Sequence, residues 1–416
     1  MTDTRRFQST TCGEHLSTAG LGRGEPQLKR SVAVVGAGPA GLTLANLIQQ
    51  SGIDCVVLEK ASRTHVETRP RAGVLEHRSV TMLESHGLAD RLLMEADRHG
   101  TCEFRVSGQA FQVAYSDLYG GRQHYVYPQQ EVVKDLIAAF LDAGGDIRFS
   151  VSDVELADLT SSRPSVSWTS ADGVRSTVTC DFVAGCDGFH GVCRPSIPDG
   201  VLTEFTHQHG IEWLAILAEA PPSTKAIIYA LHEDGFAGHM LRSPTVSRFY
   251  LQVPVGTKAS DWSDEQVWEA LHKRFALHGS TWSLTEGKII EKRVLDMRSH
   301  VVEPMSYGRL YLLGDAAHII TPVGAKGMNL AMNDAATLSH ALTDFYATGS
   351  ETGLKTYSDD CLRRVWRAQE FSQWMVNMIH TDVGSPFFGR LAQARLEHLA
   401  ESAAYRASFA ENYVGP

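Results

Sequence analysis

Apolar positions along the chain change period from segment to segment, and these changes predict alternating strands and helices. Residues 31–35 (SVAVV) are apolar on both faces of an extended chain, which is typical of a buried parallel strand. Glycine ends this run, helical spacing follows over residues 41–50, and residues 54–58 form a second apolar run. This order predicts a β–α–β unit, so at least one domain is of the α/β class.

The rest of the chain continues the mixture of the two periods. Val133, Leu136, Ile137 and Phe140 recur at the spacing of one helix face and predict an amphipathic helix. Strands are predicted within residues 146–183 with a turn at 171–173, near 226–230, near 248–253, and over 308–314. From Asn329 to about residue 406 the pattern is mostly helical.

This order of patterns predicts a mixed α/β protein in which a dinucleotide domain is assembled from separated segments. The expected boundaries are 1–29 for a loosely ordered extension; 30–100, 127–205 and 296–345 for the dinucleotide domain; 101–126 and 206–295 for a substrate-binding region; and 346–416 for a helical C-terminal region. The substrate-binding region is therefore inserted between parts of the dinucleotide domain.

Charge narrows the range of partners. The chain has 416 residues and a formal net charge of −10, with 48 acidic and 38 basic residues interleaved along it. A negative protein is repelled by phosphate backbones and by anionic lipid. We therefore expect neither nucleic acid nor a membrane surface as a partner.

Cysteine usage and the apolar runs bear on the compartment. Seven cysteines are scattered without a C-x-x-C pair, which argues against a disulfide framework and against a zinc site, so no bound metal is expected. No apolar run is long enough to cross a bilayer, and the N-terminus lacks the pattern of a signal peptide. These features favour a location in the reducing cytoplasm.

A G-x-G-x-x-G motif lies between the first predicted strand and the first predicted helix, at Gly36, Gly38 and Gly41. Glycine is needed there because a Cβ would collide with the tight turn, with a pyrophosphate, or with the helix packing on the strand. Glu59 closes the second strand, where a carboxylate accepts hydrogen bonds from a ribose diol. Together these features predict dinucleotide binding, and they do not distinguish FAD from NAD.

Two later motifs resemble those of flavin monooxygenases. Residues 313–318 (LGDAAH) resemble the second FAD motif, in which the aspartate, here Asp315, accepts hydrogen bonds from the flavin ribityl chain. Residues 186–188 (CDG), with Asp187, resemble a motif associated with both FAD and the nicotinamide donor. Gly-Asp and Asp-Gly are also common turn dipeptides. Three such motifs in this order nevertheless favour a flavoprotein.

Longer stretches make the resemblance more specific: 69–76 (RPRAGVLE), 185–191 (GCDGFHG), 261–265 (DWSDE), 324–329 (GAKGMN) and 411–415 (ENYVG). On these stretches the chain resembles the 4-hydroxybenzoate 3-monooxygenase family of flavin-dependent aromatic hydroxylases, from Ser31 to Pro416. The resemblance implies a Rossmann-like FAD-binding domain with an inserted β-sheet substrate domain, in a homodimer. It also implies FAD as cofactor, NADPH or NADH as donor, and hydroxylation of a para-substituted benzoate ortho to its hydroxyl through a flavin hydroperoxide.

The resemblance assigns catalytic roles to four residues. Tyr229 and Tyr413 match two tyrosines of a proton relay, with Tyr229 against the para oxygen of the substrate. His99 matches the outer end of the relay, where an imidazole exchanges protons with water. Pro322 matches the position whose backbone carbonyl lies over the substrate oxygen. A relay is needed because the ring must become an electron-rich phenolate when it attacks oxygen.

Four further residues line the substrate site by resemblance. Arg242 matches the arginine that forms a bidentate pair with the substrate carboxylate, and Tyr250 matches a neighbouring hydroxyl donor. Two positions depart from the family, because Met240 stands where a serine donates to the carboxylate and Val323 stands where a threonine is usual. Losing a hydrogen bond to a charged group costs about 1.5–3 kcal/mol. The pocket therefore either holds 4-hydroxybenzoate more weakly or holds 4-aminobenzoate, 3,4-dihydroxybenzoate or another substituted 4-hydroxybenzoate.

The remaining assignments concern the flavin and the electron donor. By resemblance, Arg71, Gln129 and Asn329 hold the flavin or control its swing between buried and exposed positions. The residues that meet the nicotinamide donor by resemblance are His190, Arg194, Arg248 and Arg298. Lys60 and Arg63 follow the ribose carboxylate and are able to face a 2′-phosphate, which favours NADPH over NADH.

Three other kinds of protein would share some of these motifs. A flavin oxidoreductase that inserts no oxygen would share the dinucleotide motifs, and the mass of the product distinguishes it. A non-catalytic ligand sensor on the same fold would bind FAD without ligand-stimulated oxidation of the donor. A plain NAD-dependent dehydrogenase would purify without a yellow colour.

Overall fold

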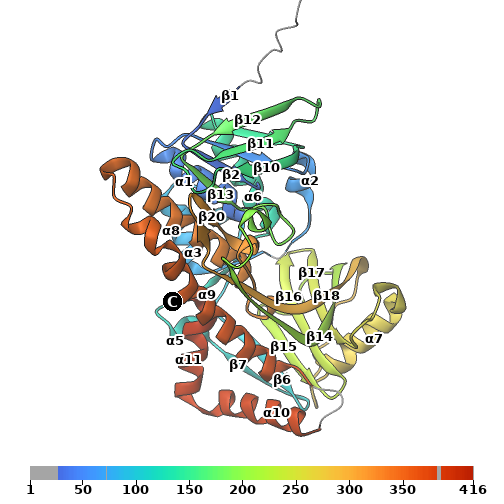
Figure 1. Cartoon of the computed structure of the whole chain (residues 1–416). Helices are drawn as coiled ribbons and strands as arrows, with labels where there is room; N and C mark the ends of the chain where they lie inside the picture. The colour runs from blue at the N-terminus through green and yellow to red at the C-terminus, as the bar shows by residue number, and fades with distance from the viewer. Residues whose placement is uncertain (1–26, 72, 382–385, 416) are drawn as a thin grey trace, which may run out of the picture.

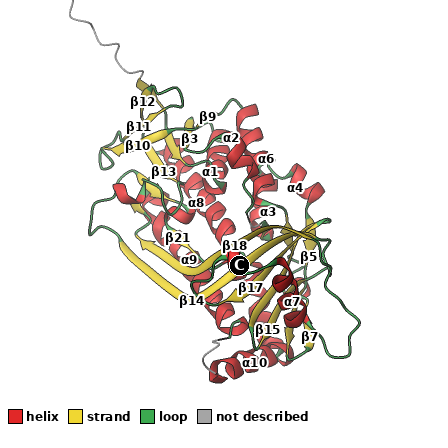
Figure 2. Cartoon of the chain, turned by 90° about the vertical axis from the view of Figure 1, so that its right-hand side faces the viewer, coloured by secondary structure: helices red, strands yellow, loops and turns green. Residues whose placement is uncertain are grey.

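The computed structural model describes residues 27–71, 73–381 and 386–415. Two large sheets, one at each end of the molecule, are connected by long helices (Figures 1 and 2). The N-terminal extension expected over residues 1–29 lies outside the described residues as far as residue 26, but strand β1 (Gln27–Lys29) is part of the fold. β1 pairs in parallel with β12 (Arg175–Thr179), so the last three residues of the expected extension pair with a sheet.

A six-stranded sheet forms the first end of the molecule, in the order β19-β20-β13-β2-β3-β9. Its strands are β2 (Val32–Val35), β3 (Cys55–Glu59), β9 (Asp146–Phe149), β13 (Phe182–Gly185), β19 (Ser306–Tyr307) and β20 (Leu310–Leu312). All neighbours run parallel except β19 and β20. The sheet is buried in the main hydrophobic core, which explains why its strands are apolar on both faces.

Three helices pack together beside this sheet. They are α1 (Pro39–Gln50), α6 (Gln129–Asp142) and α8 (Gly327–Thr348). α1 begins two residues earlier than expected, because Pro39 lacks an N–H and fits the first helical turn. The four apolar residues that predicted α6 are all buried, which confirms its inward face.

Smaller elements complete this half of the molecule. A four-stranded sheet has the order β1-β12-β11-β10, with β10 (Ser152–Ala157) and β11 (Ser165–Thr169), and a three-stranded sheet consists of β4 (Val74–Leu75), β8 (His124–Val126) and β5 (Asp97–His99). The short helices are α2 (Arg63–Thr68), α3 (His77–Ser85), α4 (Asp90–Glu95) and α5 (Tyr115–Leu118). Single turns of 3₁₀ helix are η1 (Arg194–Ser196), η2 (Ala259–Asp261), η3 (Gly314–Ala316) and η4 (Pro322–Gly324).

An eight-stranded sheet forms the other end, in the order β21-β18-β14-β17-β16-β15-β6-β7. Its strands are β6 (Cys102–Val106), β7 (Gln109–Val113), β14 (Thr203–Glu219), β15 (Ile227–His232), β16 (Gly235–Ser243), β17 (Val246–Val253), β18 (Lys288–Glu303) and β21 (His318–Ile319). The expected domain boundaries at 205 and 295 fall inside β14 and β18. These two long strands therefore run continuously from one half of the molecule into the other (Figure 1).

Helices cover the two faces of the eight-stranded sheet separately. Helix α7 (Asp264–Phe275) packs on one face. The C-terminal helices α9 (Thr352–Ile379), α10 (Pro386–Glu401) and α11 (Ala403–Val414) contribute to the core on the other face. The mostly helical character expected after Asn329 is confirmed, and it continues to Val414.

Candidate active site

The glycine-rich turn after β2 is shaped to receive a phosphate group. Gly36 has φ +108°, and a Cβ on it would lie 2.3 Å from the carbonyl oxygen of Cys186. A Cβ on Gly41 would lie 2.0 Å from the carbonyl oxygen of Gly36, so both positions require glycine. Gly38 faces open space, and no side chain caps the N-terminus of α1. The free N–H groups of this helix end therefore fit a pyrophosphate.

Glu59 lies beside this turn, at the carboxyl end of β3. Its two carboxylate oxygens accept hydrogen bonds from the backbone N–H groups of Ala37 (2.8 Å) and Ala61 (2.7 Å). The carboxylate therefore links the glycine-rich turn to the segment after β3. Lys60, the next residue, is exposed.

The neighbouring strand ends carry the two other acidic residues of the expected cofactor site. Asp187 follows β13, and its Oδ2 accepts hydrogen bonds from the N–H groups of Val192 (2.6 Å) and Cys193 (2.9 Å). Its Oδ1 is buried without a partner. Asp315 lies in η3 after β20, and its side chain is exposed. Since β20, β13, β2 and β3 are adjacent and parallel, all these residues share one edge of the sheet, where α/β proteins bind ligands.

Asn329 connects this edge to the segment after Arg71. It is buried at the start of α8, where its side-chain oxygen accepts a hydrogen bond from the N–H of Glu76 (2.9 Å). Its amide group donates to the carbonyls of Val74 (3.1 Å) and Ala325 (2.9 Å). Asn329 therefore holds the polypeptide that precedes and follows β4, rather than presenting its side chain to open space.

The other two residues expected at the flavin lie near this segment. Arg71 is half-buried, and burial together with the nearby charge of Arg69 lowers the pKa of its guanidinium. Gln129 is half-buried at the first position of α6. The next residue, Gln130, makes a contact to Arg242 that sequence analysis did not anticipate.

The two relay tyrosines, which are far apart in the sequence, meet in the folded chain. Tyr229 projects from β15 and Tyr413 from α11, and their hydroxyl oxygens are 2.9 Å apart. Tyr229 also donates a long hydrogen bond to the carbonyl of Val323 (3.4 Å). Each side chain is 2% exposed, and burial raises the pKa of both phenols above the usual range. The pair is therefore neutral and hydrogen-bonded in a dry environment.

His99, the residue assigned to the outer end of the relay, contacts Tyr115. Its Nδ1 lies 2.8 Å from the hydroxyl of Tyr115, which in turn donates to the backbone carbonyl of His99. His99 is buried, and burial lowers the pKa of its imidazole to about 4, so it is neutral near neutral pH. Its ring packs among buried aromatic side chains and its Nε2 has no partner among the described residues, so the exchange of protons with water stays a prediction.

Lys326 and Glu76 hold the backbone of Tyr413, and sequence analysis assigned no role to either residue. The Lys326 ammonium forms a buried ion pair with Glu76 and donates to the carbonyl of Tyr413 (2.8 Å). His124 contacts the same carbonyl through Nε2 (3.1 Å). Both residues of the ion pair belong to stretches that carried the family resemblance, and this membership was the only signal available in the sequence.

Arg242 lies near the end of β16, where the pairing with β17 shifts by one residue between Leu241 and Ser243. Its guanidinium donates to the carbonyl of Arg71 (2.7 Å) and to the side-chain oxygen of Gln130 (3.2 Å). Burial and the nearby charge of Arg248 lower its pKa to about 10, so it stays charged at neutral pH. Nε of Arg248 is buried without a partner. This part of the sheet is therefore strongly cationic, as the binding of a carboxylate requires.

The remaining expected substrate residues lie on or beside this sheet face. Met240 of β16 is half-buried, and Tyr250 of β17 is buried. In η4, Pro322 is exposed whereas Val323 is buried, with its carbonyl toward Tyr229. The carbonyl nearest the relay therefore belongs to Val323, one residue after the expected position.

The expected donor cluster divides into two groups. His190, Arg194 and Arg298 surround the ring of Phe189, with each guanidinium carbon 4.4 Å from the ring centroid and the imidazole centroid 4.9 Å away. Arg248 instead lies among the cations near Arg242. The sequence alone could not separate the two groups, because the register of β17 decides where Arg248 points.

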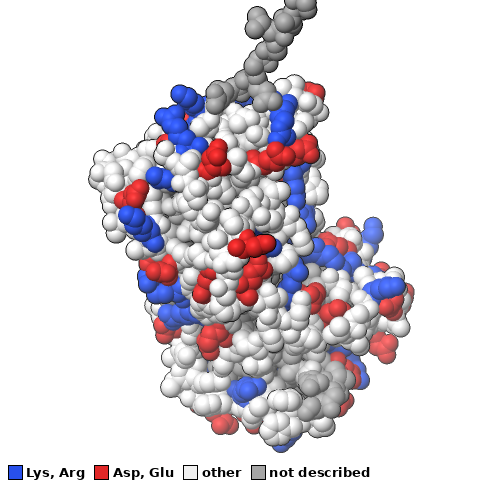
Figure 3. All heavy atoms as spheres, in the orientation of Figure 1, with Lys and Arg blue, Asp and Glu red and all other residues white. Residues whose placement is uncertain are grey.

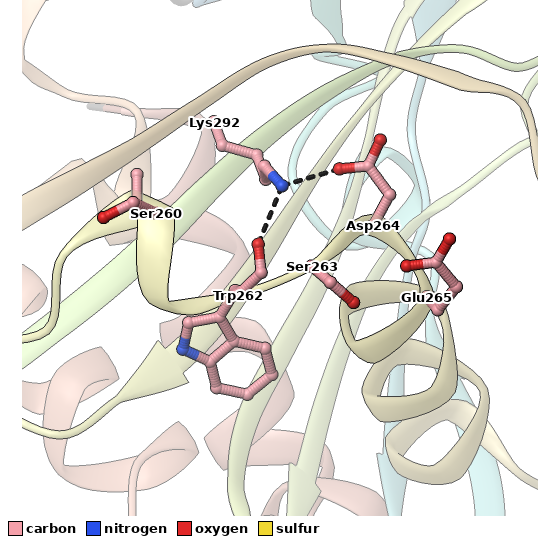
Figure 4. A pocket seen from close by; sticks show the side chains of 7 residues that line it. Ser260, Trp262, Ser263, Asp264, Glu265 and Lys292 are labelled. Atoms are coloured by element: carbon pink, nitrogen blue, oxygen red, sulfur yellow. Dashed lines mark hydrogen bonds and ion pairs between the residues drawn. The ribbon is translucent and has the colours of Figure 1, made fainter.

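A shallow recess lies away from these residues, at the start of α7 (Figure 4). Lys292 of β18 points toward the carbonyl of Trp262 (2.8 Å) and the carboxylate of Asp264 (2.6 Å). Ser263 caps α7 by accepting from the N–H of Gln266 (3.2 Å). The 261–265 stretch therefore anchors a helix to the sheet, and its role is structural.

Metal-binding side chains and cysteines do not cluster in the part of the chain that the structure describes. Within residues 27–71, 73–381 and 386–415, no cluster of histidine, cysteine and acidic side chains is arranged to hold a metal. The six cysteines of this part are unpaired and buried, whereas Cys12 lies outside it. Positive and negative side chains are interspersed on the face shown in Figure 3. Among the helices that the structure describes, none is long and apolar enough to span a membrane.

Comparisons with known proteins agree with this geometry. The FAD binding domain family matches residues 29–372. The chain is 43% identical to p-hydroxybenzoate hydroxylase of Acinetobacter baylyi over 93% of this chain and 96% of that protein. It is 27% identical to 3-(3-hydroxy-phenyl)propionate/3-hydroxycinnamic acid hydroxylase 1 of Burkholderia vietnamiensis, over 82% of this chain and 55% of that protein.

Solved structures share the fold at lower sequence identity. p-Nitrophenol 4-monooxygenase PnpA of Pseudomonas putida superposes with a TM-score of 0.74 at 20% identity, over 94% of this chain and 99% of that chain. OxyS anhydrotetracycline hydroxylase of Streptomyces rimosus superposes with a TM-score of 0.73 at 22% identity, over 93% of this chain and 76% of that chain. These likenesses confirm the mixed α/β architecture with its helical C-terminal region.

Proposed function

The chain belongs to the p-hydroxybenzoate hydroxylase family of FAD-dependent aromatic monooxygenases, and from this premise we propose that it hydroxylates a para-hydroxylated benzoate ortho to its hydroxyl. The reference reaction converts 4-hydroxybenzoate, O₂, NAD(P)H and a proton into 3,4-dihydroxybenzoate, NAD(P)⁺ and water. The observation that carries the proposal is the buried pair of Tyr229 and Tyr413, with Arg242 on the adjacent strand β16.

The tyrosine pair provides a path for the phenolic proton of the substrate. When the substrate hydroxyl donates to the oxygen of Tyr229, Tyr229 donates its own proton to Tyr413 across the 2.9 Å contact. Tyr229 gains one proton and gives one up, so it stays neutral, and Tyr413 stays neutral by releasing its own proton to the outer end of the relay, which the resemblance assigns to His99. The substrate is left as an electron-rich phenolate in a site without competing water.

Arg242 holds the opposite end of the substrate in this proposal. A guanidinium presents its donors in a fixed fork that matches both oxygens of a carboxylate. The neighbouring charge of Arg248 attracts the same anion. With the carboxylate at Arg242 and the para oxygen at Tyr229, the ring is fixed at both ends, which orients it for attack at one ortho carbon.

The cofactor and donor contacts follow from the sheet edge. When bound, FAD reduced by NAD(P)H supplies the electrophilic oxygen atom. Gly36, Gly38 and Gly41 would leave room for its pyrophosphate, with Glu59 at the ribose and Asp315 at the ribityl chain. Further flavin contacts are assigned to Arg71, Gln129, Asp187 and Asn329.

The donor would be held at two places. His190, Arg194 and Arg298 form a cationic group around Phe189 that suits the phosphates of the nicotinamide donor. The exposed Lys60 suits a 2′-phosphate, so the expected donor is NADPH rather than NADH. Arg248 lies nearer the substrate carboxylate than this group, which favours a role in anion attraction.

A homodimer is part of the proposal, as the family resemblance implies. Phe387 and Phe388 of α10 are exposed to 70% and 52%, and they supply apolar surface that a second copy would cover. Light scattering measures the mass in solution, and a monomer at micromolar concentration would contradict this assignment.

The decisive experiment measures turnover by the purified yellow protein. Oxidation of NADPH and of NADH is followed with 4-hydroxybenzoate, 4-aminobenzoate and 3,4-dihydroxybenzoate, and each product is weighed by mass spectrometry. We expect acid-stimulated oxidation and a product heavier by one oxygen. Donor oxidation that leaves every acid unchanged in mass would contradict the proposal, since a flavin oxidoreductase behaves in that way.

A further inference from the structure

A cluster of five buried rings extends from the proposed substrate site. The rings belong to Tyr229, Tyr413, His124, Tyr115 and His99. The Tyr413 ring packs against His124 and Tyr115, with centroids 4.8 Å and 5.0 Å away. The His99 ring contacts the same two residues, at 5.9 Å and 6.4 Å. His124 and Tyr115 therefore connect Tyr413 to His99.

The contacts of His124 fix the position of its ring proton. Its Nε2 lies 3.1 Å from the backbone carbonyl of Tyr413, and a carbonyl oxygen only accepts hydrogen bonds. In the neutral ring, Nε2 therefore carries the proton and Nδ1 carries a lone pair. Nδ1 is buried and has no partner among the described residues. The structure thus places a proton acceptor without a partner against the second relay tyrosine.

Tyr115 fixes the ring proton of His99 in a similar way. Its hydroxyl lies 2.7 Å from the backbone carbonyl of His99 and 2.8 Å from Nδ1 of the same residue. The hydroxyl has one proton, which it donates to the carbonyl, so Nδ1–H of His99 donates to the hydroxyl. Nε2 of His99 is left with a lone pair, and it is also buried without a partner in this part of the chain.

These two lone pairs lie in neighbouring side chains of one small sheet. His99 of β5 and His124 of β8 are directly paired, so their side chains project from the same face. Leaving a buried ring nitrogen without a hydrogen bond lowers stability, and an apolar side chain at either position would avoid that loss. Two such nitrogens beside the relay therefore indicate a chemical role.

We propose that His124 belongs to the proton relay, between Tyr413 and His99, and that Tyr115 positions His99 to accept the proton. This inference rests on the proposed function, because the proton that moves is the phenolic proton of the substrate.

Each transfer breaks one bond to hydrogen and forms another. Tyr413 takes the proton of Tyr229 and releases its own to Nδ1 of His124, which becomes an imidazolium. That proton then passes to Nε2 of His99, the most exposed of the five rings at 6%, and from there to solvent. The Tyr413 hydroxyl is bonded to Tyr229 in this structure, so the step to His124 goes through one water molecule or follows a turn of the phenol.

The surroundings of His124 make its protonated form short-lived. Burial lowers the pKa of His124 well below its usual value, and the nearby His99 and the Lys326 ammonium lower it further. Lys326 is itself paired with Glu76. The other titratable groups of the cluster are kept neutral by burial, which raises the pKa values of Tyr115, Tyr413 and Cys102. His124 is therefore ready to accept a proton at neutral pH and passes it on.

The first test separates proton transfer from packing. His124→Gln keeps an N–H for the Tyr413 carbonyl, but its amide does not take up a proton. Stopped-flow absorbance follows formation of the 4-hydroxybenzoate phenolate in the holoenzyme. We expect the rate to fall by about 10²-fold, the lower limit for loss of a positioned proton-transfer group. His239→Gln, at a buried histidine that packs on Phe249, is the control and should leave the rate unchanged. An unchanged rate in His124→Gln would overturn the proposal.

A more acidic substrate distinguishes a relay from a structural role. The two fluorines of 2,3-difluoro-4-hydroxybenzoate withdraw electrons, so its hydroxyl ionises without the relay. We expect His124→Gln to form product from this acid at a rate within about twofold of the wild type, although it is slow with 4-hydroxybenzoate. An equal loss with both acids would mean that His124 only holds the backbone of Tyr413, and the relay assignment would fail.

Tyr115→Phe tests the outer half of the relay. Without the hydroxyl, His99 is no longer held in one tautomer, so phenolate formation should slow by at least about twofold, the factor for two equally populated tautomers. If His124→Gln does not bind FAD, this variant decides, and an unchanged rate refutes the proposal. If the wild type adds no oxygen to 4-hydroxybenzoate or to the fluorinated acid, the proposed function fails and the relay fails with it. If the wild type hydroxylates and both variants are equally fast, only the relay is refuted.

Discussion

The two faces of the eight-stranded sheet use alternate residues of the same strands for different purposes. Toward α7, Ile228, Ala237 and Phe249 pack with Leu271 in a hydrophobic cluster. Toward the C-terminal helices, the next residues along two of those strands are Tyr229 and Gly238, which face the proposed substrate site. One face therefore stabilises the domain, and the other carries the hydroxyl group of Tyr229 in the proposed substrate site.

This difference shows that register, more than local composition, determines the site. A shift of one residue in the pairing of β16 would move Gly238, Met240 and Arg242 to the α7 face and would bring His239 to the substrate. Such a shift would also turn the apolar side chains of the opposite face away from α7, which disfavours it. The sheet face that packs on α7 thus helps to position the side chains of the opposite face, although it contacts no substrate itself.

The largest expected effect comes from removing the hydroxyl of Tyr229. Tyr229→Phe should lower the rate of product formation by about 10²–10⁴-fold, the range for loss of a positioned proton-transfer group. FAD binding should not change, since Tyr229 lies on the substrate sheet and not at the glycine-rich turn. Product mass per turnover and the flavin spectrum measure the two effects separately.

A second tyrosine-to-phenylalanine substitution, on the other large sheet, tests whether the loss of turnover depends on the position of Tyr229. Tyr311 of β20 is also a buried tyrosine, but it belongs to the six-stranded sheet. Tyr311→Phe should change the turnover rate by no more than about twofold from that of the wild type, the size of effect expected for a substitution away from the site. Full activity in Tyr229→Phe would exclude this residue from the relay.

The second prediction concerns stability on the α7 face. Leu271→Ala removes a fully buried side chain of α7 and should lower the free energy of unfolding by about 2–5 kcal/mol. Turnover per folded, FAD-loaded molecule should stay near that of the wild type. Urea denaturation measures the first quantity, with the exposed Glu269→Ala as a control that should change it by less than about 0.5 kcal/mol. A large loss of turnover at full FAD occupancy would show that the two faces are not separable.

The parts of the molecule that could be predicted from sequence are those whose contacts are local. The apolar run at Val32–Val35, the glycines after it and Glu59 lie within one β–α–β unit, so periodicity and glycine chemistry were enough to place them. The amphipathic helix α6 was found in the same way, since all its inward residues repeat at one spacing.

Contacts between distant segments required more than periodicity. Tyr229 and Tyr413 meet only because α11 folds back over β15, and the family resemblance was the sole reason to pair them. No pattern in the sequence indicated that Tyr115 contacts His99 or that the imidazole is buried. The domain boundary expected at 295 falls inside β18 (Lys288–Glu303), and the length of a strand is not visible in alternation alone.

The third prediction concerns a property that the two regions share. His99 of the relay region and His239 of the α7 face are both buried, and burial lowers the pKa of each to about 4. The unfolded chain binds these protons near pH 6.5, so it takes up protons that the folded chain excludes. Stability is therefore complete above about pH 6.5 and falls as the pH drops toward 4.

Urea denaturation at several pH values measures this slope. His239→Asn should reduce the slope between about pH 6 and pH 4.5 by roughly 1.4 kcal/mol per pH unit, the value for one proton. The exposed His190→Asn serves as the control and should leave the slope as it is in the wild type. An identical slope in His239→Asn would mean that His239 is protonated in the folded protein.

The smallest expected effect comes from two neighbouring residues of β16 whose side chains lie on opposite faces of the sheet. Met240→Ser places a hydroxyl donor beside Arg242, and it should tighten binding of 4-hydroxybenzoate by about tenfold, near the lower limit for a hydrogen bond to a charged group. Leu241→Ser makes a similar polar change one residue further, on the α7 face, and should leave affinity unchanged while lowering stability. Flavin absorbance titrations provide both affinities. Equal changes in the two variants would mean that the carboxylate does not lie on the face assigned here, because only the direction of the side chain differs between them.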